Sequence, residues 1–213
     1  MDHVRQKTGE KFSTYFELRD ACRNNGCPVC RLLRKAEHRY LENLLYERVN
    51  DPPTRRALRE SLGLCREHSF KFLSMGDAFG VAIIYEDLLQ ATVKRLDEEE
   101  LPQASAECPV CTNRQQSERR YVETANRHLD DHEFQQVLHA SDGVCLPHLR
   151  LITVKLQGDR KKFLLAAQKQ VLDRRIAQLN EFIRKHDYRF SREKITEEEA
   201  SSRRRAIHFL VGE

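Results

Sequence analysis

Cys27-Pro28-Val29-Cys30 recurs letter for letter as Cys108-Pro109-Val110-Cys111, and this repetition decides how the chain is organised. A second pair of motifs follows in the same order, Cys65-Arg66-Glu67-His68 in the first copy and Cys145-Leu146-Pro147-His148 in the second. Two motifs that recur in the same order indicate an internal duplication, and a duplication sets the fold. The sequence therefore predicts two homologous repeats that together cover most of the chain.

The composition favours an all-α protein. Of the 213 residues, 39% are hydrophobic and 33% are charged, which is typical of helices with a narrow buried face and a wide solvated one. The 8 glycines and 6 prolines are too few for the many turns of a large sheet. Each repeat is therefore predicted to be helical and organised around its Cys and His motifs.

The copies divide the chain into four predicted segments. In order, these are an N-terminal helix (1–26), a first repeat with its metal site and linker (27–107), a second repeat with its metal site (108–190) and a C-terminal helix (191–213). In both repeats a glycine, Gly63 or Gly143, is expected to end a helix with positive φ and to lead into the C-x2-H motif.

Local patterns predict where helices begin and which faces they bury. Thr14 with Glu17, and Thr196 with Glu199, form capping-box patterns for the two terminal helices. Four apolar residues in the last long helix are spaced so that they share one face, which we expect to be buried: Leu172, Ile176, Leu179 and Ile183.

Composition and charge also limit the function. No stretch approaches the roughly 18 consecutive apolar residues that a membrane-spanning helix requires, so no membrane partner is expected. The first residues lack the apolar region of a secretory signal, which predicts a cytoplasmic protein with reduced cysteines. A net charge of +4, with both signs interspersed, does not by itself indicate nucleic-acid binding.

The repeated cysteines and histidines form a metal-ligand pattern, C-x2-C followed by C-x2-H. Packing alone would not require cysteine at the same positions of both copies, and a redox C-x-x-C pair would need a βαβ setting. We expect two zinc ions, with iron–sulfur clusters on the same ligands as the alternative. The eight predicted ligands are Cys27, Cys30, Cys65, His68, Cys108, Cys111, Cys145 and His148.

The ligands are predicted to pair within each copy. Closing the short loop between the two motifs of one copy costs less entropy than bringing ligands together across the linker. Cys27, Cys30, Cys65 and His68 would then form one site. The alternative is an exchanged arrangement, in which the C-P-x-C motif of one copy meets the C-x2-H motif of the other.

Two polar residues after each C-P-V-C motif are also repeated. Glu37 and Tyr40 recur as Glu118 and Tyr121, and residues three apart share a helix face. These four residues are expected either to support the metal ligands through hydrogen bonds or to fasten one helix to another.

Other polar residues are weaker candidates. His38 is replaced by Arg119 in the second copy and is expected at the surface. The arginine run 203–205 suits the C-terminal part of a helix, with nucleic-acid binding as the alternative. A polar cluster unique to the second copy is expected in a solvated loop: Asp130, Asp131, His132 and His139.

The chain resembles an uncharacterised prokaryotic family of unknown function that carries duplicated CPxC and CxxH metal-binding motifs. The resemblance rests on C-P-V-C followed by Arg31-x5-Glu37-x-Arg39-Tyr40, on the Asn50-Asp51-Pro52 break, and on Leu64-Cys65-x-Glu67-His68. It would cover nearly the whole chain, and it implies a cytoplasmic bacterial or archaeal protein but no activity. The second copy departs from the pattern because it lacks the Asn-Asp-Pro break.

Together these features predict a zinc-stabilised helical protein that binds or scaffolds a partner, most simply another protein. An enzyme is less favoured, because four protein ligands leave zinc no open position for substrate or water. The alternatives are an iron–sulfur protein for electron transfer or redox sensing, and a nucleic-acid-binding module.

Overall fold

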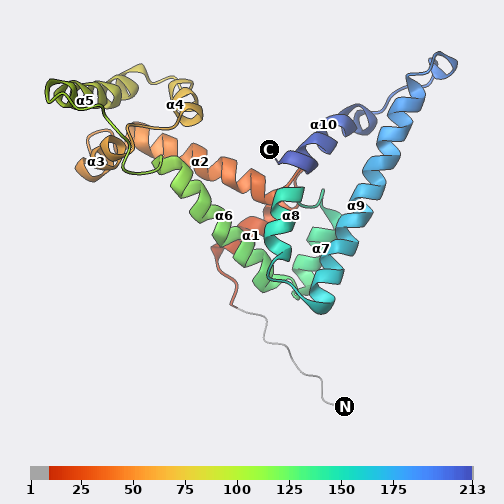
Figure 1. Ribbon diagram of the computed structural model, residues 1–213. Coiled ribbons are helices and arrows are strands. Elements are labelled where there is room, and N and C mark those ends of the chain that lie inside the picture. The colour runs from red at the N-terminus through yellow and green to blue at the C-terminus, as the bar shows by residue number, and fades with distance from the viewer. Residues whose placement is uncertain (1–9, 213) are drawn as a thin grey trace. The chain divides into compact units, whose positions relative to one another are not determined.

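The computed structural model describes residues 10–212, and over this range the chain is helical and contains no strand. The all-α prediction is therefore confirmed. Ten α-helices and one 3-10 helix follow one another along the described chain (Figure 1): α1 Ser13–Ala21, α2 Pro28–Tyr46, α3 Pro52–Glu60, α4 Arg66–Leu73, α5 Ala78–Asp97, α6 Pro109–His128, α7 His132–Ala140, α8 Leu146–Thr153, α9 Gly158–Lys185, η1 Tyr188–Phe190 and α10 Glu197–Val211.

The two copies have the same order of elements, which confirms the two homologous helical repeats. A long helix follows each C-P-V-C motif, α2 in the first copy and α6 in the second. A nine-residue helix comes next, α3 or α7, and then an eight-residue helix that begins directly after a cysteine, α4 or α8. Each copy ends on another long helix, α5 or α9.

The same local chemistry shapes both copies. Asp51 caps α3 by accepting a hydrogen bond from the backbone N–H of Thr54, and Asp131 caps α7 in the same way from Phe134. The aspartate therefore preserves the break in the second copy, although that copy lacks the two prolines. Gly63 and Gly143 have the predicted positive φ, +88° and +74°. They do not end the helices themselves, because α3 ends at Glu60 and α7 at Ala140, and a serine is the C-cap of each helix.

Only one of the two predicted capping boxes is present. Thr196 and Glu199 form it at the start of α10, where each side chain bonds the other residue's backbone N–H. The prediction for Thr14 is wrong, because the N-cap of α1 is Phe12, two residues earlier, and the helix begins at Ser13. A tertiary contact accounts for the difference, since the hydroxyl of Thr14 accepts a hydrogen bond from Thr124 on α6.

The predicted buried stripe of α9 is also wrong in its second half. Ile176 and Ile183 are 54% and 66% exposed. This half of α9 is instead tied to α10 by polar contacts, among them an ion pair between Lys185 and Glu199 at 2.7 Å. The residues that α9 buries lie mainly in its first half: Leu164, Ala167, Gln168, Val171 and Arg175.

The chain folds as two compact units. In the described part, unit 1 comprises residues 10–32 and 119–212, and unit 2 comprises residues 33–118, so both unit boundaries fall inside a helix, α2 or α6. Each unit has an apolar core, built around Tyr15, Leu18 and Phe134 in unit 1 and around Leu41, Leu58 and Phe72 in unit 2. The predicted segment boundaries at 26, 107 and 190 follow the sequence copies and stay a prediction.

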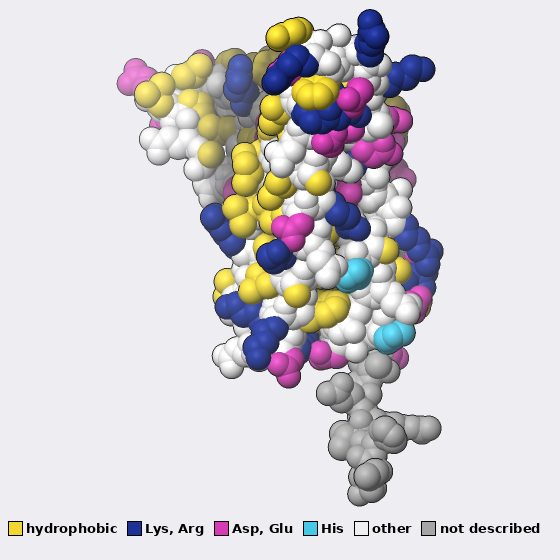
Figure 2. All heavy atoms as spheres, turned by 90° about the vertical axis from the view of Figure 1, so that its right-hand side faces the viewer, with side chains coloured by type: hydrophobic (Ala, Val, Ile, Leu, Met, Phe, Trp, Pro, Cys, Tyr) yellow, Lys and Arg dark blue, Asp and Glu magenta, His cyan; other side chains and the backbone are white. Residues whose placement is uncertain are grey.

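The described surface carries charges of both signs, together with exposed hydrophobic side chains. Figure 2 shows Lys and Arg side chains interspersed with Asp and Glu over the side of the molecule that carries α9. None of the described helices combines the length and the apolar character that crossing a membrane requires. The mixed charge agrees with the interspersed signs of the sequence and gives this face no extended basic stripe.

Candidate metal centres

Four of the predicted ligands meet in unit 1 and form what we name cluster 1: Cys27, Cys30, Cys145 and His148. The sulfur atoms of Cys30 and Cys145 lie 3.6 Å apart. Nδ1 of His148 lies 3.5, 3.4 and 3.0 Å from the sulfurs of Cys27, Cys30 and Cys145. All four donor atoms are within 4.8 Å of one another, so one metal ion could contact all of them.

The other four predicted ligands meet in unit 2 and form cluster 2: Cys65, His68, Cys108 and Cys111. Here the sulfur atoms of Cys65 and Cys111 lie 3.7 Å apart. Nδ1 of His68 lies 3.1, 3.7 and 3.5 Å from the sulfurs of Cys65, Cys108 and Cys111. The two clusters therefore use the same donor set with closely similar spacing.

The predicted pairing within each copy is wrong. Each cluster combines the C-P-V-C motif of one copy with the C-x2-H motif of the other. The prediction relied on loop entropy, but the entropy differs little between the alternatives. Bringing Cys30 to Cys145 closes a loop of 115 residues, whereas bringing Cys30 to Cys65 would close a loop of 35 residues. That difference costs only about 1 kcal/mol, because each doubling of loop length costs about 0.6 kcal/mol.

Core packing explains why the exchanged pairing prevails. Val29, inside the first C-P-V-C motif, is fully buried. It lines the same small internal cavity as Phe134 and Leu138 of the second copy. Val110, inside the second motif, is fully buried in the core of unit 2 with Leu41 and its neighbours from the first copy. Burial of a valine contributes about 1.5–3 kcal/mol, which is more than the entropy difference.

The first turns of α4 and α8 position the ligands of the two C-x2-H motifs. Cys65 and Cys145 are the N-cap residues of α4 and α8, and the histidine of each motif lies on the first turn, three residues later. Residues three apart in a helix are neighbours, so both donors of the motif point the same way. The unpaired N–H groups and the dipole of the helix N-terminus also favour the thiolate form of the cysteine.

Two features outside the motifs lie close to cluster 1. The carboxylate of Asp142 accepts a hydrogen bond of 2.8 Å from the backbone N–H of Gly26, so the loop before Cys145 is tied to the residue before Cys27. Gly212, at the end of α10, lies so close that a Cβ there would be 3.7 Å from the sulfur of Cys30. No sequence pattern indicates this approach of Gly212, because it depends on how α10 folds back.

The clusters differ in their exposure to solvent. All four residues of cluster 1 are buried. In cluster 2, Cys65 and Cys111 are partly exposed. The outer nitrogen of His68, Nε2, is buried without a hydrogen-bond partner. A histidine ligand is usually oriented by a hydrogen bond at its second nitrogen, so His68 has less support than most such ligands.

Crowding of the sulfur atoms changes their acidity when no cation lies between them. The neighbouring sulfurs of Cys145 and Cys30, together with burial, raise the pKa of the Cys27 thiol. Burial and the sulfur of Cys65 raise the pKa of Cys111 to about 12. Burial lowers the pKa of His148, but the sulfurs of Cys145 and Cys30 outweigh it and raise that pKa to about 10. A bound divalent cation would instead favour the thiolate form and lower the pKa of these thiols.

Glu37 joins the helices that carry the ligands of cluster 2. Its carboxylate is buried and pairs with Lys71 at 2.8 Å and with Arg114 at 2.6 Å. Lys71 comes three residues after His68, and Arg114 three residues after Cys111. Glu37 therefore fastens α2 to α4 and α6. The repetition of this glutamate in both copies indicated that it matters, but only the structure identifies Lys71 and Arg114 as its partners.

The other repeated polar residues have different surroundings. Tyr40 packs partly buried against the core of unit 2, and burial raises its pKa. The hydroxyl of Tyr121 donates a hydrogen bond of 2.7 Å to Glu17, which joins α6 to α1. Glu118 lies partly buried on α6. A supporting role of these residues toward the metal ligands stays a prediction.

The weaker polar candidates do not form a third site. His38 is exposed and pairs with Glu42 at 3.2 Å, as expected for a surface residue. His132 and His139 are also exposed. Asp131 departs from the expected solvated loop, because it is only 7% exposed and also accepts a hydrogen bond of 2.8 Å from Tyr15. Its role is therefore structural.

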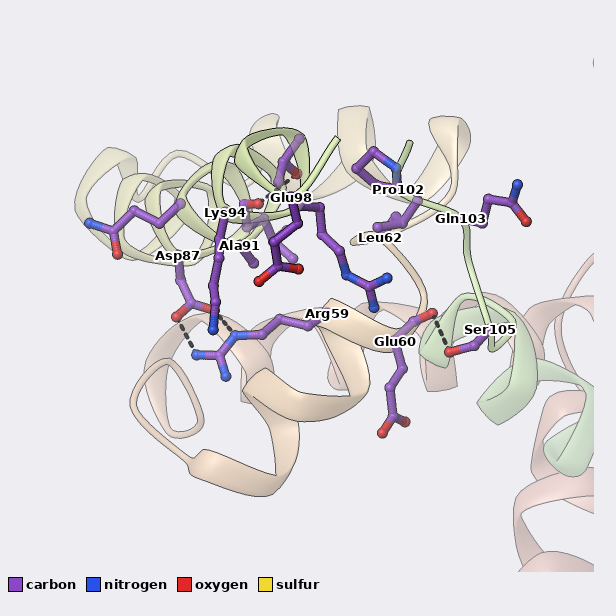
Figure 3. Close-up of a pocket in the computed structure, with 14 residues that line it drawn as sticks. Arg59, Glu60, Leu62, Asp87, Ala91, Lys94, Glu98, Pro102, Gln103 and Ser105 are labelled. Atoms are coloured by element: carbon purple, nitrogen blue, oxygen red, sulfur yellow. Dashed lines mark hydrogen bonds and ion pairs between the residues drawn. The ribbon is translucent and has the colours of Figure 1, made fainter. Parts of the chain in front are cut away.

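A cavity of about 730 Å³ in unit 2 is separate from the ligands, none of which lines it (Figure 3). It lies between α3, α5 and the segment after α5, and the side chains of Arg59, Asp87 and Lys94 turn toward one another there. Arg59 donates a hydrogen bond of 2.9 Å to the carboxylate of Asp87, and the backbone N–H of Ser105 donates one of 2.8 Å to the backbone carbonyl of Glu60. Acidic and basic groups balance in this cavity, so its charge selects no class of ligand.

Comparison with known proteins agrees with the motifs. The sequence matches the family described as "Family of unknown function (DUF6062)" over residues 13–106 and again over residues 98–213. A relative from Caldicellulosiruptor sp. (strain Rt8B.4), "Uncharacterized 23.9 kDa protein in xynA 3'region", is 28% identical over 193 residues, which cover 87% of this chain and 95% of the relative. No solved structure matches the chain significantly. The resemblance drawn from the repeated motifs is thereby confirmed.

Proposed function

Because this chain belongs to DUF6062, a family of unknown function, we propose its function from its own geometry: it is a helical binding or scaffold protein stabilised by two structural zinc ions. One observation carries the proposal. All eight repeated Cys and His residues converge as two complete sets of four donors, and each set joins segments that are far apart in the sequence.

The donor spacing fits a single tetrahedral ion. With Zn–S near 2.3 Å and Zn–N near 2.0–2.1 Å, tetrahedral geometry separates two sulfurs by about 3.8 Å and a sulfur and nitrogen by about 3.6 Å. The sulfur pairs in the two clusters lie 3.6 and 3.7 Å apart. The sulfur–nitrogen distances run from 3.0 to 3.7 Å. An iron–sulfur cluster would place inorganic atoms between the ligands and spread them further apart, so the spacing favours zinc.

A closed set of protein donors favours a structural role. Three thiolates and one imidazole complete the coordination of zinc and leave no position for substrate or an activated water. In this proposal the zinc in cluster 1 holds the first C-P-V-C motif against α8, and the zinc in cluster 2 holds the second against α4. The metals thus join the two sequence copies to each other.

We further propose a cytoplasmic location and a protein partner. Thiols that serve as zinc ligands must stay reduced, as they do in the cytoplasm, and all seven cysteines here are free. Apolar side chains exposed on α5 support a protein partner, since such surface is often covered by another protein: Phe79, Leu89 and Val93.

Metal analysis of the purified protein tests the proposal. We expect two zinc ions per chain and no visible absorbance, and His38→Ala should keep both ions because this surface residue lies outside the clusters. A coloured protein that contains iron and inorganic sulfide would support the electron-transfer alternative instead. Strong chelation should lower the melting temperature, since structural zinc contributes about 10–16 kcal/mol in small zinc modules. Full stability of the metal-free protein would contradict the structural role.

Two double variants test the exchanged pairing. Cys30→Ser with Cys145→Ser damages only cluster 1 and should leave one zinc per chain. Cys30→Ser with Cys65→Ser damages both clusters and should leave none. Pairing within each copy would give the opposite result, so the two variants serve as matched controls for each other.

A further inference from the structure

A pocket of about 270 Å³ opens in unit 1 beside cluster 1, and the sulfur-bearing residues Cys27 and Cys145 form part of its wall. Its lining is rich in arginine from three separate helices, α2, α9 and α10: Arg31, Arg175, Arg204 and Arg205. Arg31 lies far from the arginine run 203–205 in the sequence. The fold brings them to the same pocket.

One of the four arginines is already paired. Arg175 is 8% exposed and donates hydrogen bonds to the backbone carbonyls of Asp142, at 2.6 Å, and Arg205, at 3.1 Å. Its guanidinium also lies 3.7 Å from the carboxylate of Asp142. Arg175 and Asp142 therefore neutralise each other in the lining of the pocket.

The other three arginines keep unused donors. Nε of Arg31 is buried without a hydrogen-bond partner, while another nitrogen of this guanidinium donates to the carbonyl of Asn25 at 2.7 Å. The side chains of Arg204 and Arg205 form no hydrogen bond or ion pair with the described part of the chain. Apart from Asp142, which pairs with Arg175, the acidic residue that lines the pocket is Glu197, exposed on the first turn of α10.

The pocket is therefore positively charged. Four arginines against the two carboxylates of Asp142 and Glu197 leave two positive charges in excess. A zinc ion bound by the three thiolates of cluster 1 would carry one net negative charge, which offsets only half of this excess. The pocket thus attracts anions whether or not the proposed zinc is present.

We propose that this pocket binds a phosphate group, either as free phosphate or as the phosphoryl end of a small phosphate monoester. Guanidinium groups hold phosphate through paired N–H donors, and three of them converge here with donors to spare. The volume is below the roughly 300–1,000 Å³ of pockets for larger ligands, so the group attached to the phosphate must be small. Ser201 also lines the pocket, and its hydroxyl donates a hydrogen bond of 3.2 Å to the backbone carbonyl of Glu198.

Arg203 provides a matched control on the same helix. Its guanidinium does not line the pocket but lies over the ring of Phe182, 5.4 Å from the ring centre. Arg203→Ala and Arg204→Ala remove the same charge from adjacent positions of α10. A general electrostatic effect should change both variants alike, whereas a pocket should distinguish them.

The test is calorimetric titration of the full-length, metal-loaded protein with inorganic phosphate and with glycerol 3-phosphate, at an ionic strength held constant with NaCl. We expect one site per chain. Arg204→Ala and Arg205→Ala should each weaken binding at least tenfold, and Arg203→Ala less than twofold. Circular dichroism and zinc content, unchanged in all variants, would show that the fold is intact.

Either probe binding in this way supports the pocket, and the tighter of the two identifies free phosphate or a monoester as the ligand. Absence of saturable binding to both probes would overturn the proposal. Equal weakening in all three variants would also overturn it. So would tighter binding of a single-stranded oligonucleotide that Arg203→Ala weakens as much as Arg204→Ala, because this would assign the arginines to a nucleic-acid surface.

Discussion

Replacing Glu37 with alanine should destabilise unit 2 and loosen cluster 2. The carboxylate is 2% exposed and accepts charge-assisted hydrogen bonds from Lys71 at 2.8 Å and Arg114 at 2.6 Å. Such a bond contributes about 1.5–3 kcal/mol, but both cations are about one-third exposed, which reduces the value through solvent screening. We therefore expect a total loss of about 2–4 kcal/mol.

A thermal melt followed by circular dichroism measures this loss. For a chain of about 200 residues, 1 kcal/mol shifts the melting temperature by about 2–4 °C, so Glu37→Ala should lower it by about 5–15 °C. The matched control is Glu42→Ala on the same helix, where the carboxylate is 48% exposed and, within residues 10–212, pairs only with His38. The control should change stability by less than about 0.5 kcal/mol.

The pH dependence of this effect follows from the lowered pKa of Glu37. Burial alone would raise the pKa, but Lys71 and Arg114 outweigh burial and hold it below its ordinary value. A carboxylate with a lowered pKa adds stability that is complete above its unfolded pKa and is lost as the pH falls through the folded pKa. The stability difference between the native protein and Glu37→Gln should therefore be full at pH 7 and shrink below about pH 4.

Equal melting temperatures for Glu37→Ala and Glu42→Ala would refute the role assigned to Glu37. A second readout separates the metal site from general stability. In Glu37→Ala, a chromogenic chelator should remove zinc from cluster 2 faster, while release from cluster 1 should keep its rate. Equal acceleration at both clusters would mean that Glu37 supports the whole fold and not the helices around cluster 2.

Two further outcomes follow from the same geometry. Because Cys65 and Cys111 are partly exposed whereas cluster 1 is buried, a chelator should release zinc from the native protein in two phases, and Cys65→Ser should abolish the faster one. Loss of the faster phase in Cys30→Ser instead would contradict this order. Gly143→Ala should lower the free energy of unfolding by about 1–3 kcal/mol, as measured by urea denaturation, because φ is +74° and the new Cβ would lie 2.7 Å from the side chain of Gln168. Gly76→Ala, with φ of +92° but no atom within 4 Å, should show only the backbone part of that cost, and an equal loss in both variants would exclude the contact with Gln168.

Local patterns in the sequence were enough for the fold class and for the identity of the eight converging residues. Helix composition, the capping box of Thr196 and Glu199, and the positive φ of Gly63 and Gly143 depend on residues a few positions apart, so they can be predicted from spacing alone. The duplication added long-range information, because it showed which Cys and His residues recur together. The Thr14 pattern and the α9 stripe failed where a tertiary contact outweighed a local preference.

The tertiary structure decided the pairing of the ligands and the pocket beside them. The alternative pairings differ by only about 1 kcal/mol in loop entropy, so spacing along the chain cannot select between them. The buried positions of Val29 and Val110, each in a core completed by the other copy, make the selection. That Arg31, Arg204 and Arg205 line one pocket likewise depends on the return of α10 to the start of α2, which places residues more than 170 positions apart around the same space. Such contacts arise from the burial of apolar surface over the whole chain, and no short stretch of sequence records them.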